Sequence, residues 1–161
     1  MTQRFPMTPA GLETLRVELK RLKEVERPQN VQDIEVALGH GDLRENAEYH
    51  AAKERQAEIA ARISNLESRI GLAQVIDPET IKSETIGFGA TVTLTDMDSD
   101  EEVVYRIVGE TESDVKAGKI SIAAPIAQAM LGKAEGDDVV VRLPKGDREF
   151  EVVKVEYKRI P

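Results

Sequence analysis

The stretch IAARISNLESRIGLA, residues 59–73, decides the fold of the first half of this chain. Its apolar residues recur at steps of four, three, four and three, which is the spacing of a helix that packs along one seam against a partner helix. The seam residues are Ile59, Ile63, Leu66, Ile70 and Ala73. The spacing therefore predicts a long helix that needs a partner elsewhere in the sequence.

The partner helix precedes this stretch. A stripe with the same alternating spacing consists of Leu12, Leu15, Leu19 and Leu22. Thr8 is suited to cap this helix, and Pro9 suits its first position, where a missing amide proton costs nothing. Pro28 interrupts the pattern, so the helix either kinks or starts afresh, and we expect it to continue with a kink. The stripe resumes with Val31, Ile34 and Leu38.

A short turn separates the two helices. Gly39, His40 and Gly41 end the first stripe, and helical patterning returns at Asp42. Two helices of roughly 30 residues joined by so short a turn must lie antiparallel, and each spans roughly 45 Å at about 1.5 Å per residue. Because Pro78 prevents the second helix from continuing, residues 1–77 are predicted to form an antiparallel coiled-coil hairpin domain.

After Pro78 the period changes from helical to alternating. The predicted strands cover residues 90–94, 102–108, 139–143 and 149–155, with a hairpin turn at 144–147 and a short helix at 125–131. An antiparallel sheet with this helix on one face would bury Val92, Leu94, Ile107, Val139, Val141, Phe150 and Val152. Residues 78–161 are therefore predicted as a second domain of an α+β protein. The acidic segment 96–102 is interpreted as a solvated loop.

Composition limits the function. The 161 residues carry a formal net charge of −8, opposite in sign to that of an autonomous DNA-binding protein. Aromatic residues make up 4%, which is too little for a platform that stacks single-stranded bases. The chain has no cysteine and no apolar stretch of membrane-spanning length. We therefore expect a cytoplasmic protein without a membrane partner, whose main partner is another protein.

The segment Asp42-Leu43-Arg44-Glu45 follows the turn and has two interpretations. Its spacing is that of a capping box, in which Asp42 and Glu45 would satisfy free amides at a helix start. The same spacing brings two carboxylates within reach of one cation. Two carboxylates make an incomplete magnesium site that a partner would have to complete.

Basic and polar residues surround the acidic pair. The basic ones are Arg44, Lys53 and Arg55. They could neutralise the phosphates of an RNA backbone, but each could equally pair with a carboxylate on an exposed helix face. The residues expected to support the turn are Gly41, Asn46, Tyr49 and His50.

The longer motif HGDLRENAEYHAAK, residues 40–53, closely resembles the tip motif of bacterial Gre transcript cleavage factors, of the GreA branch in particular. The resemblance extends over nearly the whole chain, through PMT (6–8), FGATV (88–92), YRIVG (105–109), PIA (125–127) and FEV (150–152). It implies an N-terminal antiparallel coiled coil and a C-terminal domain similar in fold to FKBP-type prolyl isomerases.

The resemblance also implies a function. Members of this family bind RNA polymerase through the C-terminal domain, pass the coiled coil down the secondary channel and stimulate the polymerase's own cleavage of backtracked RNA. The chain itself would then not be an enzyme. Asp42 and Glu45 would help to hold a magnesium ion of the polymerase active site near the 3′ end of the nascent RNA, and no cofactor would be tightly bound. Lys53 lies where relatives often carry a basic residue that faces RNA.

The same resemblance implies the binding surface. The residues implied in polymerase binding, at the rim of the secondary channel, are Ala124, Pro125 and Ile126. Ala124 stands where serine is frequent and would lack one hydrogen bond to the polymerase. Leu38 and Gly39 stand where charged residues are common, which indicates a weaker basic patch or a looser tip. We expect a monomer that associates with the nucleoid through the polymerase.

Two other functions are weighed against this one. A channel-binding regulator could modulate or inhibit the polymerase without stimulating cleavage, but such relatives lack or alter the Asp-Leu-basic-Glu arrangement. A prolyl isomerase or chaperone is suggested only by the fold of the second domain. That domain offers few aromatic residues for the walls of a proline pocket.

Overall fold

The structure, a computed structural model, describes residues 3–41 and 46–161. By their contacts these residues form two compact units. We call Glu13–Leu72 the hairpin unit, and the described residues up to Leu12 together with Ala73–Pro161 the sheet unit. Among the described residues, every helix is too short or too polar to span a membrane.

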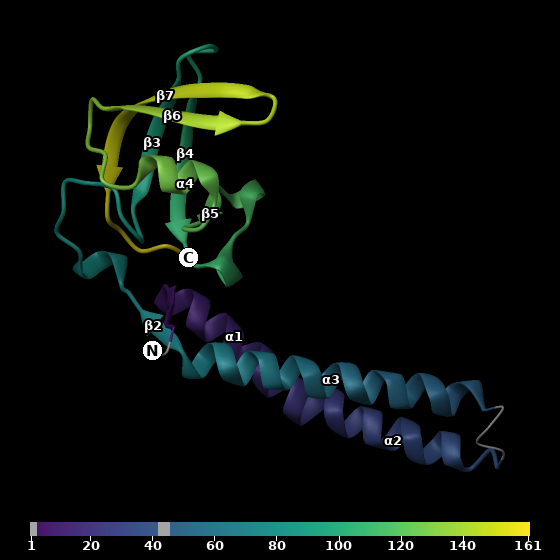
Figure 1. Cartoon of the computed structure of the whole chain (residues 1–161). Coiled ribbons are helices and arrows are strands. Elements are labelled where there is room, and N and C mark those ends of the chain that lie inside the picture. The colour runs from purple at the N-terminus through teal and green to yellow at the C-terminus, as the bar shows by residue number, and fades with distance from the viewer. Residues whose placement is uncertain (1–2, 42–45) are drawn as a thin grey trace. The chain divides into compact units, whose positions relative to one another are not determined.

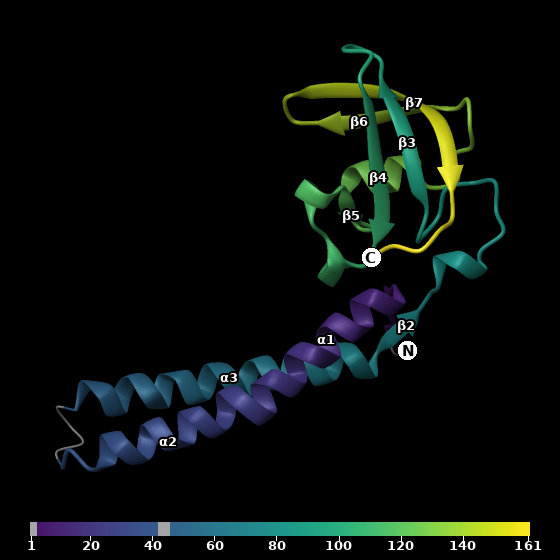
Figure 2. The same cartoon turned by 180° about the vertical axis from the view of Figure 1, so that it is seen from behind.

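The hairpin unit has two helical arms (Figures 1 and 2). The first arm consists, without a break, of α1 (Pro9–Arg21), the π-helix η1 (Leu22–Glu26) and α2 (Arg27–Leu38). The second arm is α3 (Ala47–Gly71). Glu18 pairs with Arg62, and Ala37 is bonded to Asn46, so residues early in one arm meet residues late in the other. The arms are therefore antiparallel, as predicted, and the first arm continues through Pro28 as expected.

The π-helix changes which residues of the first arm face α3. In η1 the carbonyl of Leu22 accepts a hydrogen bond from the amide five residues ahead, so this turn holds one residue more than an α-helical turn. The buried seam therefore passes from Leu22 to Asn30, eight residues on, and then to Ala37. Of the predicted continuation through Val31, Ile34 and Leu38, Ile34 is half-buried, but Val31 and Leu38 are wrong, because they are 47% and 46% exposed.

Asn30 is the polar member of this seam. Its side chain is 4% exposed, and its Nδ2 donates a hydrogen bond of 2.9 Å to the carbonyl of Ala52 on α3. A buried polar group with one well-placed partner favours a single alignment of two helices. The predicted seam residues of α3 that are buried are Ile59, Ile63 and Leu66. Ala73, also predicted for this seam, lies beyond the end of the helix.

The sheet unit contains a five-stranded sheet in the order β5-β4-β3-β7-β6 (Figure 1). Its strands are β3 (Thr91–Asp96), β4 (Glu102–Val108), β5 (Lys119–Ser121), β6 (Asp138–Leu143) and β7 (Gly146–Glu156). Neighbours are antiparallel except β4 and β5, which are parallel. The four predicted strands are confirmed, with the predicted turn between β6 and β7, whereas the short β5 was not predicted.

Short elements complete the sheet unit. They are β1 (Phe5–Met7), β2 (Ala73–Val75), η2 (Pro78–Thr80), η3 (Glu110–Glu112), η4 (Val115–Ala117) and α4 (Pro125–Met130). In the sequence β1 precedes α1 and β2 follows α3, and the two strands pair in parallel. Neither strand was predicted, because three residues are too few to show an alternating pattern.

The core of the sheet unit lies between the sheet and α4. Every residue predicted for this core is buried, and Ala127 and Met130 of α4 pack against the same cluster. The acidic segment differs from the prediction at its first residue, because Asp96 is 6% exposed. Its carboxylate accepts hydrogen bonds from Arg148 and from the amide of Asp98, and the Arg148 guanidinium holds the pKa of Asp96 below its usual range. Residues 97–102 are exposed, as predicted.

Candidate site at the tip of the hairpin unit

Glycines let the chain leave α2. The amides of Gly39, His40 and Gly41 donate to carbonyls three residues back at 3.1–3.3 Å, so the last turn tightens before it ends. Gly41 has a φ of +95°, in the left-handed region that favours glycine. The end of α2 therefore uses the turn chemistry that the sequence predicts.

Asn46 connects the two arms at the tip. It is the N-cap of α3, and its Oδ1 accepts a hydrogen bond of 3.0 Å from the amide of Tyr49. Its Nδ2 donates to the carbonyl of Ala37 in the last turn of α2, at 2.6 Å. One side chain thus caps the second arm and binds it to the first.

Asp42, Arg44 and Glu45 lie outside the described residues. The neighbouring residues show where the second arm starts: α3 begins at Ala47, and Asn46 is its N-cap. α3 therefore starts later than the predicted return of helical patterning at Asp42, while the predicted capping box of Asp42 and Glu45 lies outside the described residues. The helix does not need this acidic pair as its cap.

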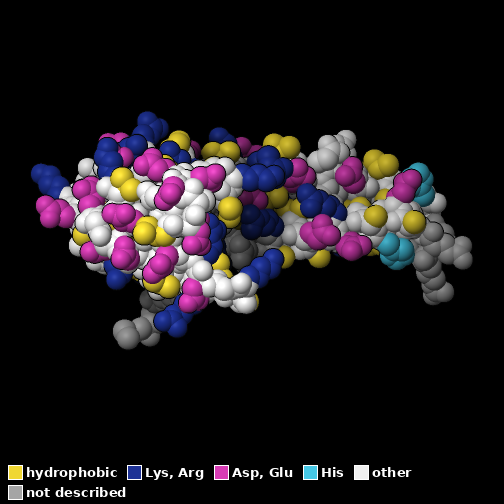
Figure 3. All heavy atoms as spheres, turned by 90° about the horizontal axis from the view of Figure 1, so that it is seen from above, with side chains coloured by type: hydrophobic (Ala, Val, Ile, Leu, Met, Phe, Trp, Pro, Cys, Tyr) yellow, Lys and Arg dark blue, Asp and Glu magenta, His cyan; other side chains and the backbone are white. Residues whose placement is uncertain are grey.

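Three residues with ring side chains, His40, Tyr49 and His50, stand on either side of the connection between the arms. His40 Nε2 lies 2.9 Å from a carboxylate oxygen of Glu48, so this pair also links the end of α2 to the first turn of α3. The rings of Tyr49 and His50 meet edge to face, with centroids 5.7 Å apart. Tyr49 is half-buried, and both histidines are exposed at the tip end of the hairpin unit (Figure 3, cyan).

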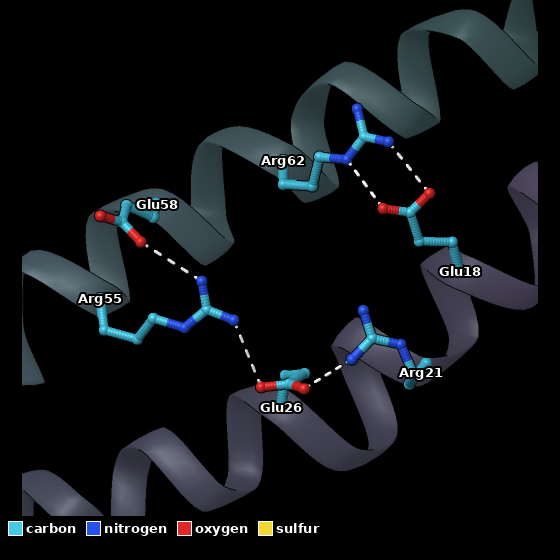
Figure 4. A network of polar contacts seen from close by, with 6 residues as sticks. All are labelled: Glu18, Arg21, Glu26, Arg55, Glu58 and Arg62. Carbon is cyan, nitrogen blue, oxygen red and sulfur yellow. Dashed lines mark hydrogen bonds and ion pairs between the residues drawn. The ribbon is translucent and has the colours of Figure 1, made fainter. Parts of the chain in front are cut away.

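Arg55 belongs to a network of ion pairs on one face of the hairpin unit (Figure 4). Its guanidinium contacts Glu58 at 3.2 Å and Glu26 at 3.3 Å, and the hydrogen bonds that it donates to these two carboxylates raise the pKa of Arg55. In the same network Arg62 meets Glu18 through two hydrogen bonds of 2.9 Å. The positive charge of Arg55 is therefore already compensated by carboxylates of the chain itself.

Lys53, two residues earlier on α3, faces a different groove. This groove of about 710 Å³ lies between the two arms. Most of its lining side chains are small or apolar, and Lys53 and Arg27 also line it. Lys53 donates to the neutral side chain of Gln56 at 2.7 Å. Among the described residues, neither Lys53 nor Arg27 has a carboxylate partner. The sequence pattern grouped Lys53 with Arg55 and gave no sign of Arg27, which lines this groove in the folded hairpin unit.

The residues predicted to bind polymerase lie at the start of α4, in the sheet unit. Ala124 is the N-cap and has no side-chain oxygen to cap the helix, while Pro125 occupies the first helical position. Pro125 is exposed, whereas Ala124 and Ile126 are half-buried against the core. Of these three residues, Pro125 presents the largest fraction of its surface to a partner.

The predicted magnesium ligands are Asp42 and Glu45, and this prediction stays a prediction because both lie outside the described residues. Carboxylate oxygens are the ligands that magnesium prefers in proteins. Within residues 3–41 and 46–161, no cluster of three or more His, Asp or Glu side chains could hold a metal ion.

The two units define an α+β protein in which a helical hairpin with an acidic connection precedes a sheet domain. Comparison with known protein families identifies the family to which this protein belongs. The family described as "Transcription elongation factor, N-terminal" matches residues 5–75, and the one described as "Transcription elongation factor, GreA/GreB, C-term" matches residues 81–157. The chain belongs to the GreA/GreB family of transcription elongation factors, as the tip motif predicts.

Two curated relatives agree with this assignment. Transcription elongation factor GreA from Anaeromyxobacter sp. (strain K) is 54% identical over 155 residues, which cover 96% of this chain and 93% of the relative. GreA from Jannaschia sp. (strain CCS1) is also 54% identical, and the match covers 96% of this chain and 99% of the relative. The crystal structure of GreA factor homolog 1 from Thermus thermophilus is 32% identical and matches 96% of this chain and 99% of its own, with a TM-score of 0.44.

Proposed function

We propose that this chain stimulates RNA polymerase to cleave backtracked nascent RNA, as an accessory factor rather than an enzyme. Its relatives at 54% identity are named GreA elongation factors. The observation that carries the proposal is the place of the acidic pair. In the sequence Asp42 and Glu45 stand between the end of α2 at Leu38 and Asn46, which is the N-cap of α3.

In this proposal the hairpin enters the secondary channel of the polymerase and presents Asp42 and Glu45 to the active centre. Two carboxylates leave most positions around a magnesium ion open, so the polymerase and the RNA must provide the other ligands. When bound, the shared ion would activate the attacking water and stabilise the charge that develops during phosphodiester hydrolysis. The chain supplies ligands, and catalysis stays with the polymerase.

A hairpin that acts at a distance from its anchor must hold its own shape. The ion pairs of Figure 4 join the arms along one face, and the buried hydrogen bond from Asn30 to Ala52 favours a single alignment of the two helices. Asn46 then fixes the tip ends of both arms to each other. These contacts support a role in which the tip is presented in one position.

Lys53 is the stronger candidate for a contact with the RNA backbone. A phosphate that approaches Arg55 competes with two carboxylates, whereas Lys53 and Arg27 have no carboxylate partner within the described part of the chain, although Glu67 also lines their groove. Contacts of this kind neutralise phosphates without reading base sequence. We therefore assign RNA contact to Lys53 and a structural role to Arg55.

The sheet unit is the proposed anchor on the polymerase. Pro125 is exposed at the first position of α4, and its ring has a fixed backbone angle, so little conformational freedom is lost when a partner covers it. Ala124 offers no hydroxyl for a hydrogen bond to the polymerase. We therefore expect this surface to bind mainly through apolar contact.

Backtracked elongation complexes with a labelled RNA 3′ end test the proposal. In the presence of magnesium, the added protein should release short labelled 3′ fragments faster than the polymerase does alone. Polymerase binding without faster release would contradict the proposal and would indicate a channel-binding regulator instead.

A further inference from the structure

The first turn of α1 is capped in an unusual way. Thr8 is its N-cap, as the sequence predicts, because its Oγ1 accepts a hydrogen bond of 3.2 Å from the amide of Gly11 and its carbonyl accepts one from Leu12. In a capping box, the residue three positions after the cap is Glu or Gln, whose side chain returns to the amide of the cap residue. Here that position is Gly11, which has no side chain.

The missing carboxylate comes from Glu112, 104 residues further along the chain. Its Oε2 accepts a hydrogen bond of 3.1 Å from the amide of Thr8, and its Oε1 accepts one from the Thr8 hydroxyl. The same Oε2 accepts a third, of 2.9 Å, from the amide of Gly109 in its own loop. Thr8 is 1% exposed, so these donors would be unsatisfied without Glu112.

Two glycines make room for this arrangement. A Cβ atom on Gly11 would lie 2.3 Å from Cδ of Glu112, and a Cβ atom on Gly109 would lie 2.3 Å from the carbonyl oxygen of Pro6. Gly11 is helical with no positive φ, so its backbone conformation does not require glycine. Glycine is among the least favourable residues in a helix, and the space taken by Glu112 is a reason for its presence there.

We infer that Glu112 completes the capping box of α1 from the loop after β4, and that Thr8, Gly11, Gly109 and Glu112 form a clasp that fixes where the first arm of the hairpin starts. α1 begins inside the sheet unit and continues past Leu12 into the hairpin unit. The clasp holds the first turn of that helix to the loop 109–112 of the sheet unit. Glu112 therefore caps the start of α1, the first segment of the arm that continues through η1 to the end of α2.

If this clasp forms, a methyl group at position 11 should change the midpoint of thermal unfolding in opposite directions with and without the Glu112 carboxylate. In the full chain, Gly11→Ala should lower the midpoint of thermal unfolding, because the methyl group displaces the carboxylate from its three donors. In a Glu112→Ala background the same change should raise the midpoint by about 2–4 °C, because alanine is the better helix former. Gly71→Ala, also in a helix but with open space around it, is the matched control and should have the same effect in both backgrounds.

A second variant moves the carboxylate instead of removing it. Gly11→Glu combined with Glu112→Ala creates a local capping box, Thr8 to residue 11, and should restore the slow hydrogen exchange of the Thr8 amide that Glu112→Ala alone accelerates at least about tenfold. Exchange that stays fast in the double variant would overturn the inference. So would a Gly11→Ala effect that has the same sign with and without Glu112.

Discussion

Asn46 allows the two contacts that close the tip to be separated by mutation. Asn46→Ala removes both the cap on Tyr49 and the bond to the carbonyl of Ala37, whereas Asn46→Ser keeps a capping oxygen but cannot reach Ala37. Loss of an N-cap costs about 1 kcal/mol and loss of one such hydrogen bond also about 1 kcal/mol. We therefore expect the opening of the tip to become about 30-fold more favourable in the alanine variant and about 5-fold in the serine variant.

Hydrogen exchange of the Tyr49 amide measures this opening directly. That amide lies in the first turn of α3, where no carbonyl of the same helix is available, so its protection depends on Asn46 Oδ1. Exchange should accelerate strongly in Asn46→Ala and weakly in Asn46→Ser. Equal acceleration in both variants would refute the division into a cap and a cross-arm bond, and unchanged exchange in both would refute the capping role itself.

Three further predictions follow from the described contacts. Leu66→Ala should lower the free energy of unfolding, measured by urea denaturation, by about 2–5 kcal/mol, because Leu66 is fully buried in the seam. The control Val17→Ala changes a residue that is 58% exposed and should alter this free energy by about 0.5 kcal/mol or less. Asp96→Asn should destabilise the protein at neutral pH, and the difference from the wild type should shrink as the pH falls below about 4. The reason is that Arg148 depresses the folded-state pKa of Asp96, so its stabilising charge is present above the unfolded-state pKa and is lost in acid; a difference that stays constant down to pH 2 would contradict this. Lys53→Gln should weaken the stimulation of transcript cleavage more than Arg55→Gln at low salt, and the opposite order would show that the ion pairs of Arg55 open in the complex.

Features with a repeated pattern could be predicted from the sequence. The seam of α3 is visible because each of its buried residues lies at helical spacing, and the core strands are visible because apolar residues alternate along them. The division into a helical and a sheet-rich half follows from the change of period near Pro78. Periodicity needs several residues to become visible, so the three-residue strands β1, β2 and β5 could not be found.

Features that depend on one or a few individual hydrogen bonds could not be predicted. The buried seam of the first arm steps eight residues from Leu22 to Asn30 instead of seven because η1 inserts one residue into a turn, and the spacing of Val25 and Val31 gives no sign of it. The start of α3 was misplaced because Asp and Asn are both good N-cap residues, and the hydrogen bond from the Tyr49 amide that identifies Asn46 as the cap is visible only in the structure.

The same distinction, between a continuous sequence pattern and contacts between distant residues, applies to the candidate site. The tip residues could be proposed because they form one continuous motif, whereas Glu112 was missed because its partner Thr8 lies 104 residues away in the sequence. Arg27 was missed because its groove exists only in the folded hairpin. Contacts between distant segments leave no spacing signal in a single sequence.

Transcript cleavage by backtracked polymerase, with a variant that combines Asp42→Asn and Glu45→Gln, measures the role of the acidic pair most directly. A variant that combines Asp33→Asn and Glu35→Gln removes the same charge from exposed residues of α2 and is the matched control. We expect the tip variant to bind the polymerase as well as the wild type but to release no more RNA fragments than the polymerase alone, while the control variant stays active. Cleavage as fast with the tip variant as with the wild type would contradict the role of these two carboxylates.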